Sequence, residues 1–155
     1  MSDSSLFIRR EPVLDAWVDY NGHLSEPYYV LAMSNATDAI LDAVGMGEEY
    51  RSGSGSSFYT VELHVRLLAE VRTRSDLEVR SWIIGCTAKA AHIWHELWVD
   101  GTLRATEEVL GVHVTGTSSS PFPPAIADCL RTYVVEPPTH AGRAIRLRDD
   151  VTSQG

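Results

Sequence analysis

Lysine is almost missing from this sequence, and acidic residues outnumber basic ones. The chain has 155 residues, with 21 Asp and Glu against 13 Lys and Arg, and its single lysine is Lys89. The formal net charge of −8 argues against non-specific binding to nucleic acid or to anionic membranes, because their phosphate groups would be repelled. We therefore expect neither nucleic acid nor a membrane among its partners.

Cysteine is scarce, and long apolar runs are absent. Cys86 and Cys129 lie far apart and form no CxxC motif, which is typical of free thiols in a reducing compartment. No apolar stretch approaches the roughly 18 residues that a membrane-spanning helix needs, and the first residues lack the apolar core of a signal peptide. The sequence therefore predicts a cytoplasmic protein.

The length and composition are those of a single globular domain. Hydrophobic residues make up 44% of the chain and charged residues 22%, close to the averages for such proteins. Neither an internal repeat nor a linker divides the sequence. We therefore expect one domain over residues 1–155, with an irregular tail from about residue 115 that contains one short helix over residues 125–133.

One long helix is predicted over residues 27–44. A stripe with spacings of three and four residues indicates its buried face, and consists of Val30, Met33, Thr37, Ile40 and Val44. Ser25 is a good N-cap, Pro27 is tolerated in the first turn, and Gly45 can end the helix.

The remaining pattern is that of strands. A short strand over residues 7–13 is interrupted by Pro12, and SGSGSS at 52–57 is predicted to be a flexible loop. From Tyr59 to Leu67 the odd positions are apolar and the even ones polar, which predicts a half-buried strand. Further strands are expected over residues 77–83, 91–99 and 103–114, with Asp100-Gly101 forming a hairpin turn.

These elements predict an α+β fold. About five antiparallel strands, four of them in a meander, would wrap around the single long helix. Because one helix cannot cover both faces of such a sheet, we expect the outer face and the sheet edges to pair with another subunit.

The stretch DYNGH at residues 19–23 is the best candidate for chemistry. Gly22 permits a sharp turn or a close approach to a ligand, and the N–H groups at the start of the following helix can bind an oxyanion. Asp19 stands just before them, where a carboxylate could attack a carbonyl group or activate water. The alternative is an ordinary turn in which Asp19 and Asn21 only make local hydrogen bonds.

The stretch VDYNGHLSEPYY resembles the signature of hotdog-fold acyl-CoA thioesterases of the 4-hydroxybenzoyl-CoA thioesterase type, roughly D-x-x-G-H-x-N-x-x-Y. Asp19, Gly22, His23 and Tyr28 match this pattern, while Ser25 replaces the usual Asn. The segment VELHVRLLAEVRTRSDLEV is similar to the second and third strands of that family. The resemblance implies the hotdog fold, in which a sheet wraps around one long helix.

The sequence resembles more closely the subgroup of betainyl-CoA thioesterases, some of which are fused to carnitine dehydrogenase. The similar segments span most of residues 8–148 and are WVDYNGHLSEPYY, FYTVELHVRLLAEVR, HIWHELW and AGRAIRLR. The resemblance implies hydrolysis of a short polar acyl-CoA, betainyl-CoA or another such as 4-hydroxybenzoyl-CoA, without a cofactor. It also implies a homodimer, or a tetramer of dimers, with active sites at the subunit interface.

The resemblance further assigns roles to residues of the loop. Asp19 would be the nucleophile or the general base, and backbone N–H groups near His23 and Leu24 would bind the thioester oxygen. Because another branch of these enzymes carries its acid on the helix, Asp38 is a second candidate, although a residue of this kind is more often a solvated helix residue.

Substrate-binding residues are expected near the loop and on the strand that begins at Tyr59. A carboxylate and aromatic faces would complement a trimethylammonium group, and the candidates are Glu62, Tyr20, Tyr28, Tyr29, Tyr59 and the loop residue Asn21. Alternatively, Glu62 lies on a solvated face and the aromatic residues belong to the core. Candidates for binding the phosphates of coenzyme A are Arg66, Arg72, Arg74 and Lys89.

Other readings of the motifs are weaker. In HIWHE, His92 and His95 would point to opposite faces of a strand, so we expect no metal site. Hotdog hydratases carry D-x-N-P-x-H, but this sequence has Gly22 where that motif has Pro. A non-catalytic acyl-CoA-binding module is the third alternative.

Overall fold

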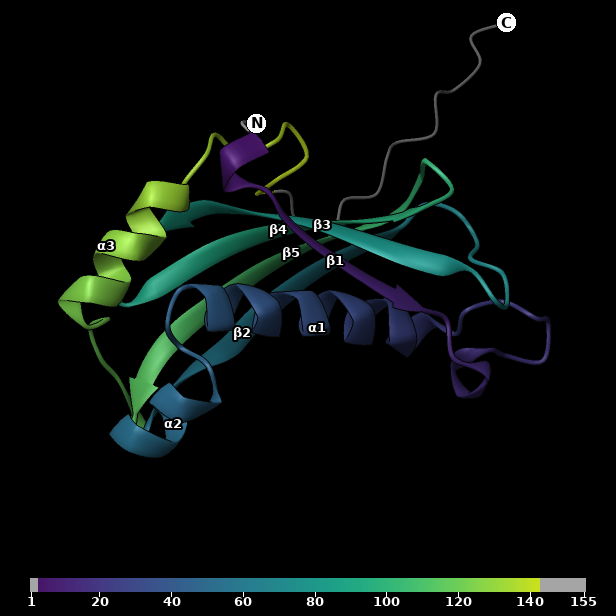
Figure 1. The fold of residues 1–155 in the computed structure, drawn as a ribbon. Helices are drawn as coiled ribbons and strands as arrows, with labels where there is room; N and C mark the ends of the chain where they lie inside the picture. The colour runs from purple at the N-terminus through teal and green to yellow at the C-terminus, as the bar shows by residue number, and fades with distance from the viewer. Residues whose placement is uncertain (1–2, 143–155) are drawn as a thin grey trace, which may run out of the picture.

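The computed structural model describes residues 3–142, so the segment after Gly142, including most of AGRAIRLR, lies outside the described residues. Helix α1 (Glu26–Ala43) lies along one face of a curled antiparallel sheet (Figure 1). The strands are β1 (Phe7–Pro12), β2 (Ser56–Leu67), β3 (Asp76–Cys86), β4 (Ala90–Val99), β5 (Thr102–Thr115) and the two-residue β6 (Ser118–Ser119). The other elements are η1 (Asp3–Ser5), η2 (Asp15–Trp17), α2 (Glu48–Ser54) and α3 (Pro124–Tyr133). The predicted long helix, α+β class and short C-terminal helix are confirmed.

The strand order is β1-β3-β4-β5-β2, with β6 paired to the end of β5. Strands β3, β4 and β5 form the predicted meander, but the expectation that β2 would pair with β3 is wrong. Strand β2 pairs instead with β5, and the eight residues 68–75 cross to β3, which lies beside β1. A segment of this length easily spans the roughly 14 Å between strands three positions apart.

The core lies between α1 and the concave face of the sheet. Its members on α1 include Met33 and Ile40, and on the sheet Leu77, Ile83 and Leu97, all at most 1% exposed. Burying each of these side chains contributes on the order of 2 kcal/mol. The helix therefore owes its position to the apolar stripe that its sequence predicts.

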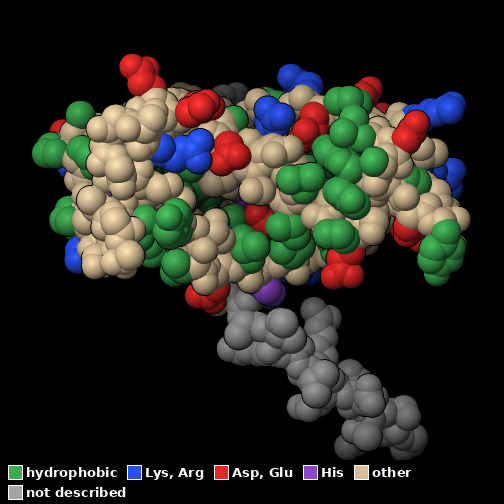
Figure 2. Space-filling model, turned by 90° about the horizontal axis from the view of Figure 1, so that it is seen from below, with side chains coloured by type: hydrophobic (Ala, Val, Ile, Leu, Met, Phe, Trp, Pro, Cys, Tyr) green, Lys and Arg blue, Asp and Glu red, His purple; other side chains and the backbone are tan. Residues whose placement is uncertain are grey.

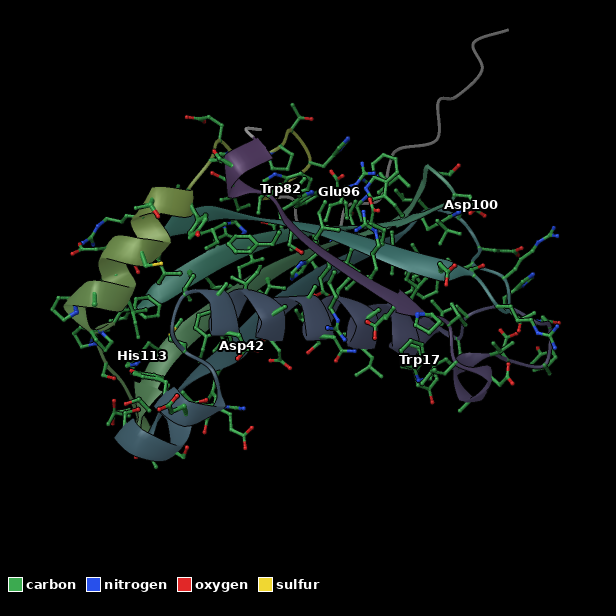
Figure 3. The ribbon with its side chains drawn as sticks, in the orientation of Figure 1. Trp17, Asp42, Trp82, Glu96, Asp100 and His113 are labelled. Carbon is green, nitrogen blue, oxygen red and sulfur yellow. The ribbon has the colours of Figure 1, made fainter. Side chains whose placement is uncertain are left out.

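The outer face of the sheet is covered in part by the chain itself. Trp82 and Trp94 are buried there among Leu6, Val135 and Ala141, and Figure 3 places Trp82 and Glu96 on the side away from α1. The Val135 N–H donates to the Ile83 carbonyl at 3.0 Å, which is a strand-like contact. Over the described residues, the expectation that another subunit must cover this face is therefore wrong in part.

The predicted loop at 52–57 is also wrong. Residues up to Ser54 continue helix α2, Gly55 ends it with a φ of +68°, and Ser56 begins β2. Serine and glycine favour loops, but the Ser52 and Ser54 hydroxyls donate to the Glu48 and Tyr50 carbonyls at 2.8 and 2.6 Å. These bonds allow a helix that the composition alone does not favour.

A β-bulge at Val61 reverses the two faces of β2. Before it, Phe58 points to the core side and fills the space above Gly111, where an added Cβ would lie 2.0 Å from the ring. After it, Leu63 and Val65 face the α1 side, opposite Val109 and Glu107. The prediction of unbroken alternation from Tyr59 to Leu67 is therefore wrong, and Tyr59 shares the outer face with Glu62.

Strand β2 is an exposed edge of the sheet. Large apolar side chains that are more than one third exposed gather on it and just after it: Tyr59, Val61, Leu63, Leu67 and Leu68. Figure 2 looks onto the α1 side of the molecule, where hydrophobic side chains lie grouped along the middle and the right half. Edge strands of this kind are unusual in monomers.

Candidate active site

The DYNGH loop is a tight turn that leads into α1. The Gly22 N–H donates to the Asp19 carbonyl at 3.0 Å, and the Asp19 N–H donates to the His23 carbonyl at 2.8 Å. Gly22 has a φ of +77°, which favours glycine, yet an added Cβ would meet nothing within 4 Å. The structure supports the sharp turn at Gly22, while a close approach of a ligand to its backbone stays a prediction.

The loop is held in place by the connection between β2 and β3. The Leu24 N–H donates to the Val71 carbonyl at 2.7 Å, and the Thr73 N–H donates to the Gly22 carbonyl at 3.1 Å. His23 and Arg72 form an isolated antiparallel bridge. Both segments lie at the same end of the sheet, beside the start of α1 (Figure 1). These two hydrogen bonds fix the loop that carries Asp19 relative to the start of the helix.

One oxygen of the Asp19 carboxylate is used by the loop itself. Its Oδ1 accepts hydrogen bonds from the N–H groups of Asn21, at 2.8 Å, and His23, at 3.2 Å. Among the described residues no hydrogen bond reaches Oδ2. The carboxylate is half-buried, so it is oriented by the backbone while one oxygen stays free to act on a ligand.

The predicted oxyanion donors are engaged elsewhere. The His23 N–H binds Asp19, and the Leu24 N–H binds Val71. In this structure the expectation that these two groups are free donors is therefore wrong. The helix begins only at Glu26, and its positive end lies there.

A pocket of about 410 Å³ opens beside the carboxylate. Its lining comes from the loop, the first turn of α1 and the end of β2, and consists of Asp19, Asn21, His23, Leu24, Glu26, Tyr29, Leu67, Leu68, Ala69 and Glu70. Three of these residues are acidic and none is lysine or arginine. The His23 Nε2 lies 3.2 Å from a Glu70 oxygen. The pocket is therefore suited to a ligand group that is neutral or positively charged.

The four predicted tyrosines have separate environments. Tyr29 lines the pocket, its hydroxyl donates to the Ala69 carbonyl at 3.3 Å, and burial raises its pKa. Tyr28 stacks on Trp17 with ring centroids 5.7 Å apart, and Figure 3 shows Trp17 beside the start of α1. Tyr20 is 97% exposed, and Tyr59 lies on the outer face of β2. Within one chain only Tyr29 belongs to the pocket.

The predicted charged residues are scattered as well. Glu62 is exposed on the outer face of β2, opposite the face that carries Leu63, and Arg66 shares that outer side. Arg72 and Arg74 are exposed in the β2–β3 connection next to the loop. Lys89 lies in the β3–β4 turn, at the other end of β3. Within one chain, the structure brings only Arg72 and Arg74 near Asp19.

The histidines and Asp38 take no part in this pocket. His92 binds Glu108 at 2.6 Å on the outer face, while His95 is fully buried on the inner face, as the strand pattern predicts. Residues 3–142 contain no group of three or more His, Cys, Asp or Glu placed to bind a metal ion. Asp38 is exposed on α1 and does not line the pocket.

Sequence reasoning missed several residues of the pocket. Leu67, Leu68 and Glu70 belong to the end of β2 and the connection that follows it. Glu26 was recognisable only as an acid favoured at a helix start. The adjacent leucines Leu67 and Leu68 could have indicated this part of the pocket, because an apolar pair at the end of a strand often lies against another element.

Known proteins resemble this chain in sequence and in fold. The model of the thioesterase-like superfamily matches residues 13–130. A betainyl-CoA thioesterase of Pseudomonas aeruginosa is 37% identical over 147 residues, covering 88% of this chain and 91% of that protein. An L-carnitine dehydrogenase/betainyl-CoA thioesterase of Agrobacterium fabrum is also 37% identical. This match covers 96% of the present chain but only 32% of the A. fabrum protein.

A solved structure agrees in the fold. A Staphylococcus aureus protein in complex with CoA superposes with a TM-score of 0.86 at 22% identity, over 92% of this chain and 96% of that one. No helix within residues 3–142 is long and apolar enough to cross a membrane. The family match covers the DYNGH loop, α1 and the whole meander. The chain therefore belongs to the thioesterase-like superfamily, has the hotdog fold and is a thioester hydrolase.

Proposed function

We propose that the protein hydrolyses betainyl-CoA to betaine and free CoA, as a step in carnitine breakdown. The observation that carries this proposal is the acid-rich pocket at Asp19, which also contains Glu26 and Glu70 and has no lysine or arginine in its lining. A cationic acyl group would be attracted there, and an anionic one repelled. The names of the relatives from P. aeruginosa and A. fabrum point to the same substrate.

Asp19 is the group that acts on the thioester in this proposal. Its Oδ2 either attacks the carbonyl carbon or takes a proton from the water that attacks it. If Oδ2 attacks, the C–S bond breaks to give an acyl–Asp19 anhydride, which water then hydrolyses to betaine and the free carboxylate. If water attacks, the C–S bond breaks directly and betaine is released. In both cases CoA leaves as the thiolate and takes up a proton that comes from the water. The two backbone N–H groups on Oδ1 keep the carboxylate aligned during these steps.

The start of α1 stabilises the negative charge on the carbonyl oxygen. Because the His23 and Leu24 N–H groups are engaged, the donor would be the N–H of Glu26, the first helical residue. Pro27, which follows, has no N–H to offer. The helix dipole adds to this single hydrogen bond.

The CoA moiety would extend from the pocket over the β2–β3 connection. Arg72 and Arg74 are exposed there and can neutralise its phosphates. Arg66 and Lys89 would contribute only if a second subunit brought them to the site. A CoA ester as substrate and the free cysteines fit a cytoplasmic enzyme.

The working form in this proposal is a homodimer formed across β2. Two copies of this edge can pair antiparallel about a two-fold axis, which would cover Leu63 and Leu67 and extend the sheet. Leu67 and Leu68 also line the pocket, so the partner would complete the site.

Leu63→Lys is expected to produce monomers, because two copies of the new ammonium group would face the same interface. The wild-type chain should have at least twice the 17.1 kDa chain mass by light scattering coupled to gel filtration, and the variant a single chain mass. Ile8→Lys, at the opposite edge strand β1, is the matched control and should stay associated. A monomeric wild-type enzyme with full activity would contradict the proposed dimer.

A panel of acyl-CoAs tests the substrate. Release of free thiol should be fastest with betainyl-CoA, at least about tenfold above acetyl-CoA and 4-hydroxybenzoyl-CoA in kcat/KM, because only the betainyl group carries a positive charge. A preference for 4-hydroxybenzoyl-CoA would instead identify an aroyl-CoA thioesterase. Equal turnover of all three esters would rule out selection by charge.

A further inference from the structure

Among the described residues, His23 is the histidine that lines the Asp19 pocket. Its backbone is tied to Asp19 at two points. The His23 N–H donates to Asp19 Oδ1 at 3.2 Å, and the His23 carbonyl accepts from the Asp19 N–H at 2.8 Å. The side chain is 30% exposed and lines the same pocket as the carboxylate. The loop therefore keeps an imidazole ring close to the group that acts on the thioester in the proposed mechanism.

The ring of His23 has one polar partner among residues 3–142, the carboxylate of Glu70. The His23 Nε2 lies 3.2 Å from Glu70 Oε2, and no described group makes a hydrogen bond with Nδ1. Histidines that are buried in the sheet differ in this respect, because both ring nitrogens of His95, and both of His113, have hydrogen-bond partners within the fold. The His23 ring thus keeps a nitrogen available for proton transfer.

Glu70 is held beside this ring by β5. The Arg104 Nη1 donates to the Glu70 carbonyl at 3.2 Å, and the Arg104 carbonyl accepts from the N–H groups of Leu68, at 2.8 Å, and Ala69, at 3.1 Å. Because the guanidinium group binds the carbonyl of Glu70, the carboxylate is left facing His23. A carboxylate at this distance stabilises the imidazolium that forms when the ring accepts a proton.

Attack by Asp19 leaves the pocket in need of a second base. Once Oδ2 carries the acyl group as an anhydride, it cannot accept a proton, and Oδ1 is bound by two N–H groups. Yet the water that hydrolyses the anhydride must lose a proton, and the CoA thiolate must gain one.

The other titratable side chains of the lining are poorly suited to these two transfers. Glu26 and Glu70 are exposed, and solvated carboxylates are weak bases. The Tyr29 hydroxyl donates to the Ala69 carbonyl, and burial raises the pKa of Tyr29, so it keeps its proton. An imidazole suits both transfers, because it takes up and releases protons near neutral pH.

We propose that the His23 side chain is a catalytic proton carrier and that Glu70 is the positioning residue of its ring. This inference rests on the proposed attack by Asp19 on the thioester, but not on the identity of the acyl group. As water attacks the acyl carbon of the anhydride, Nδ1 takes one of its protons and the bond to Asp19 Oδ2 breaks. The Asp19 carboxylate is restored, and the carboxylic acid that forms ionises in water. The imidazolium then gives its proton to the sulfur of the CoA thiolate.

His23→Ala should separate the two halves of the reaction. Rapid mixing with the fastest ester of the acyl-CoA panel should release about one equivalent of thiol per active site in a burst. The steady state that follows should be about 100-fold slower than in the wild type, because the second half lacks its base. Imidazole added to the buffer should restore part of the steady-state rate and leave the burst unchanged.

The matched control is His140→Ala, which removes an exposed imidazole outside the pocket. It should show wild-type rates and no response to added imidazole. Circular dichroism verifies the fold of each variant, and His23→Gln takes the place of His23→Ala if the alanine variant does not fold.

Glu70→Gln tests the positioning role while the ring stays in place. At saturating ester it should lower kcat by about fivefold, a modest effect because the Glu70 side chain is 71% exposed. In the His23→Ala background the same substitution should have no further effect on kcat, because Glu70 acts through the ring. Glu49→Gln, an exposed acid on α2 outside the pocket, is the control and should keep wild-type kcat.

The outcomes separate this inference from the proposed function. If His23→Ala keeps the wild-type steady-state rate, or loses the burst together with turnover, the ring is not the proton carrier, while thioester hydrolysis stands. If Glu70→Gln lowers kcat equally in both backgrounds, Glu70 does not act through His23. If the wild type releases no thiol from any ester, or Asp19→Asn keeps full turnover, the proposed function itself is wrong.

Discussion

Asp19→Asn is expected to lower kcat for thioester hydrolysis by about 10³-fold, because the amide can neither attack the carbonyl group nor accept a proton from water. The substitution is well suited to the loop. The Asn Oδ1 can keep the two hydrogen bonds from the Asn21 and His23 N–H groups, while only the chemistry of the second oxygen changes. The loss should therefore appear in kcat without unfolding the protein, and initial rates of thiol release measure it.

Two further variants complete this experiment. Asp19→Ala also removes the acceptor of the two N–H groups, so it should lose both activity and about 1 kcal/mol of stability. Asp38→Asn, the exposed acid on α1, is the control and should retain wild-type kcat. Near-normal turnover in Asp19→Asn would exclude this carboxylate as nucleophile or base.

Glu107→Gln is expected to gain stability relative to the wild type as the pH rises from 5 to 8. Burial raises the pKa of Glu107 from 4.5 to about 8, so the folded state keeps a proton that the unfolded chain has released. The stability contributed by this group is fully present below pH 4.5 and is lost as the pH rises through 8. Each pH unit in this range removes on the order of 1 kcal/mol of the stability that Glu107 contributes, and this loss is absent from the variant because Gln has no proton to lose.

The buried His95 affects the stability of the protein at acidic pH. Burial lowers the pKa of His95 from 6.5 to about 3, so its contribution is present above pH 6.5 and is lost as the pH falls toward 3. Between pH 4.5 and 6.5 the folded pair and the unfolded pair each hold one proton, on Glu107 and on His95 respectively. The two groups together therefore predict a stability plateau in that window.

Urea unfolding at each pH measures this effect as the difference between the wild type and Glu107→Gln. Glu62→Gln is the control, because an exposed carboxylate should give a difference curve that is nearly flat with pH. A flat curve for Glu107→Gln as well would mean that Glu107 is ionised and paired in solution, which would contradict the unpartnered carboxyl group of the structure.

Much of the fold was predictable because local patterns determine local structure. The stripe through Met33 and Ile40 identified α1, and alternation identified the strands. The prediction of a loop at 52–57 was wrong because the serine hydroxyls donate hydrogen bonds to helix carbonyl groups. The prediction that β2 pairs with β3 was wrong because the neighbours of a strand depend on how residues 68–75 cross the sheet. Local sequence patterns do not determine that path.

The sequence by itself determined that a single helix would pack on an antiparallel sheet, and that Asp19 and Gly22 would stand at the helix start, since short-range spacing and turn chemistry decide both. Only the tertiary structure decided which groups share the pocket. The bulge at Val61 turned Glu62 away, long-range bonds engaged the Leu24 N–H, and the β2–β3 connection brought Leu68 and Glu70 to the pocket. These are contacts between segments far apart in the chain, and they depend on packing rather than on local preference.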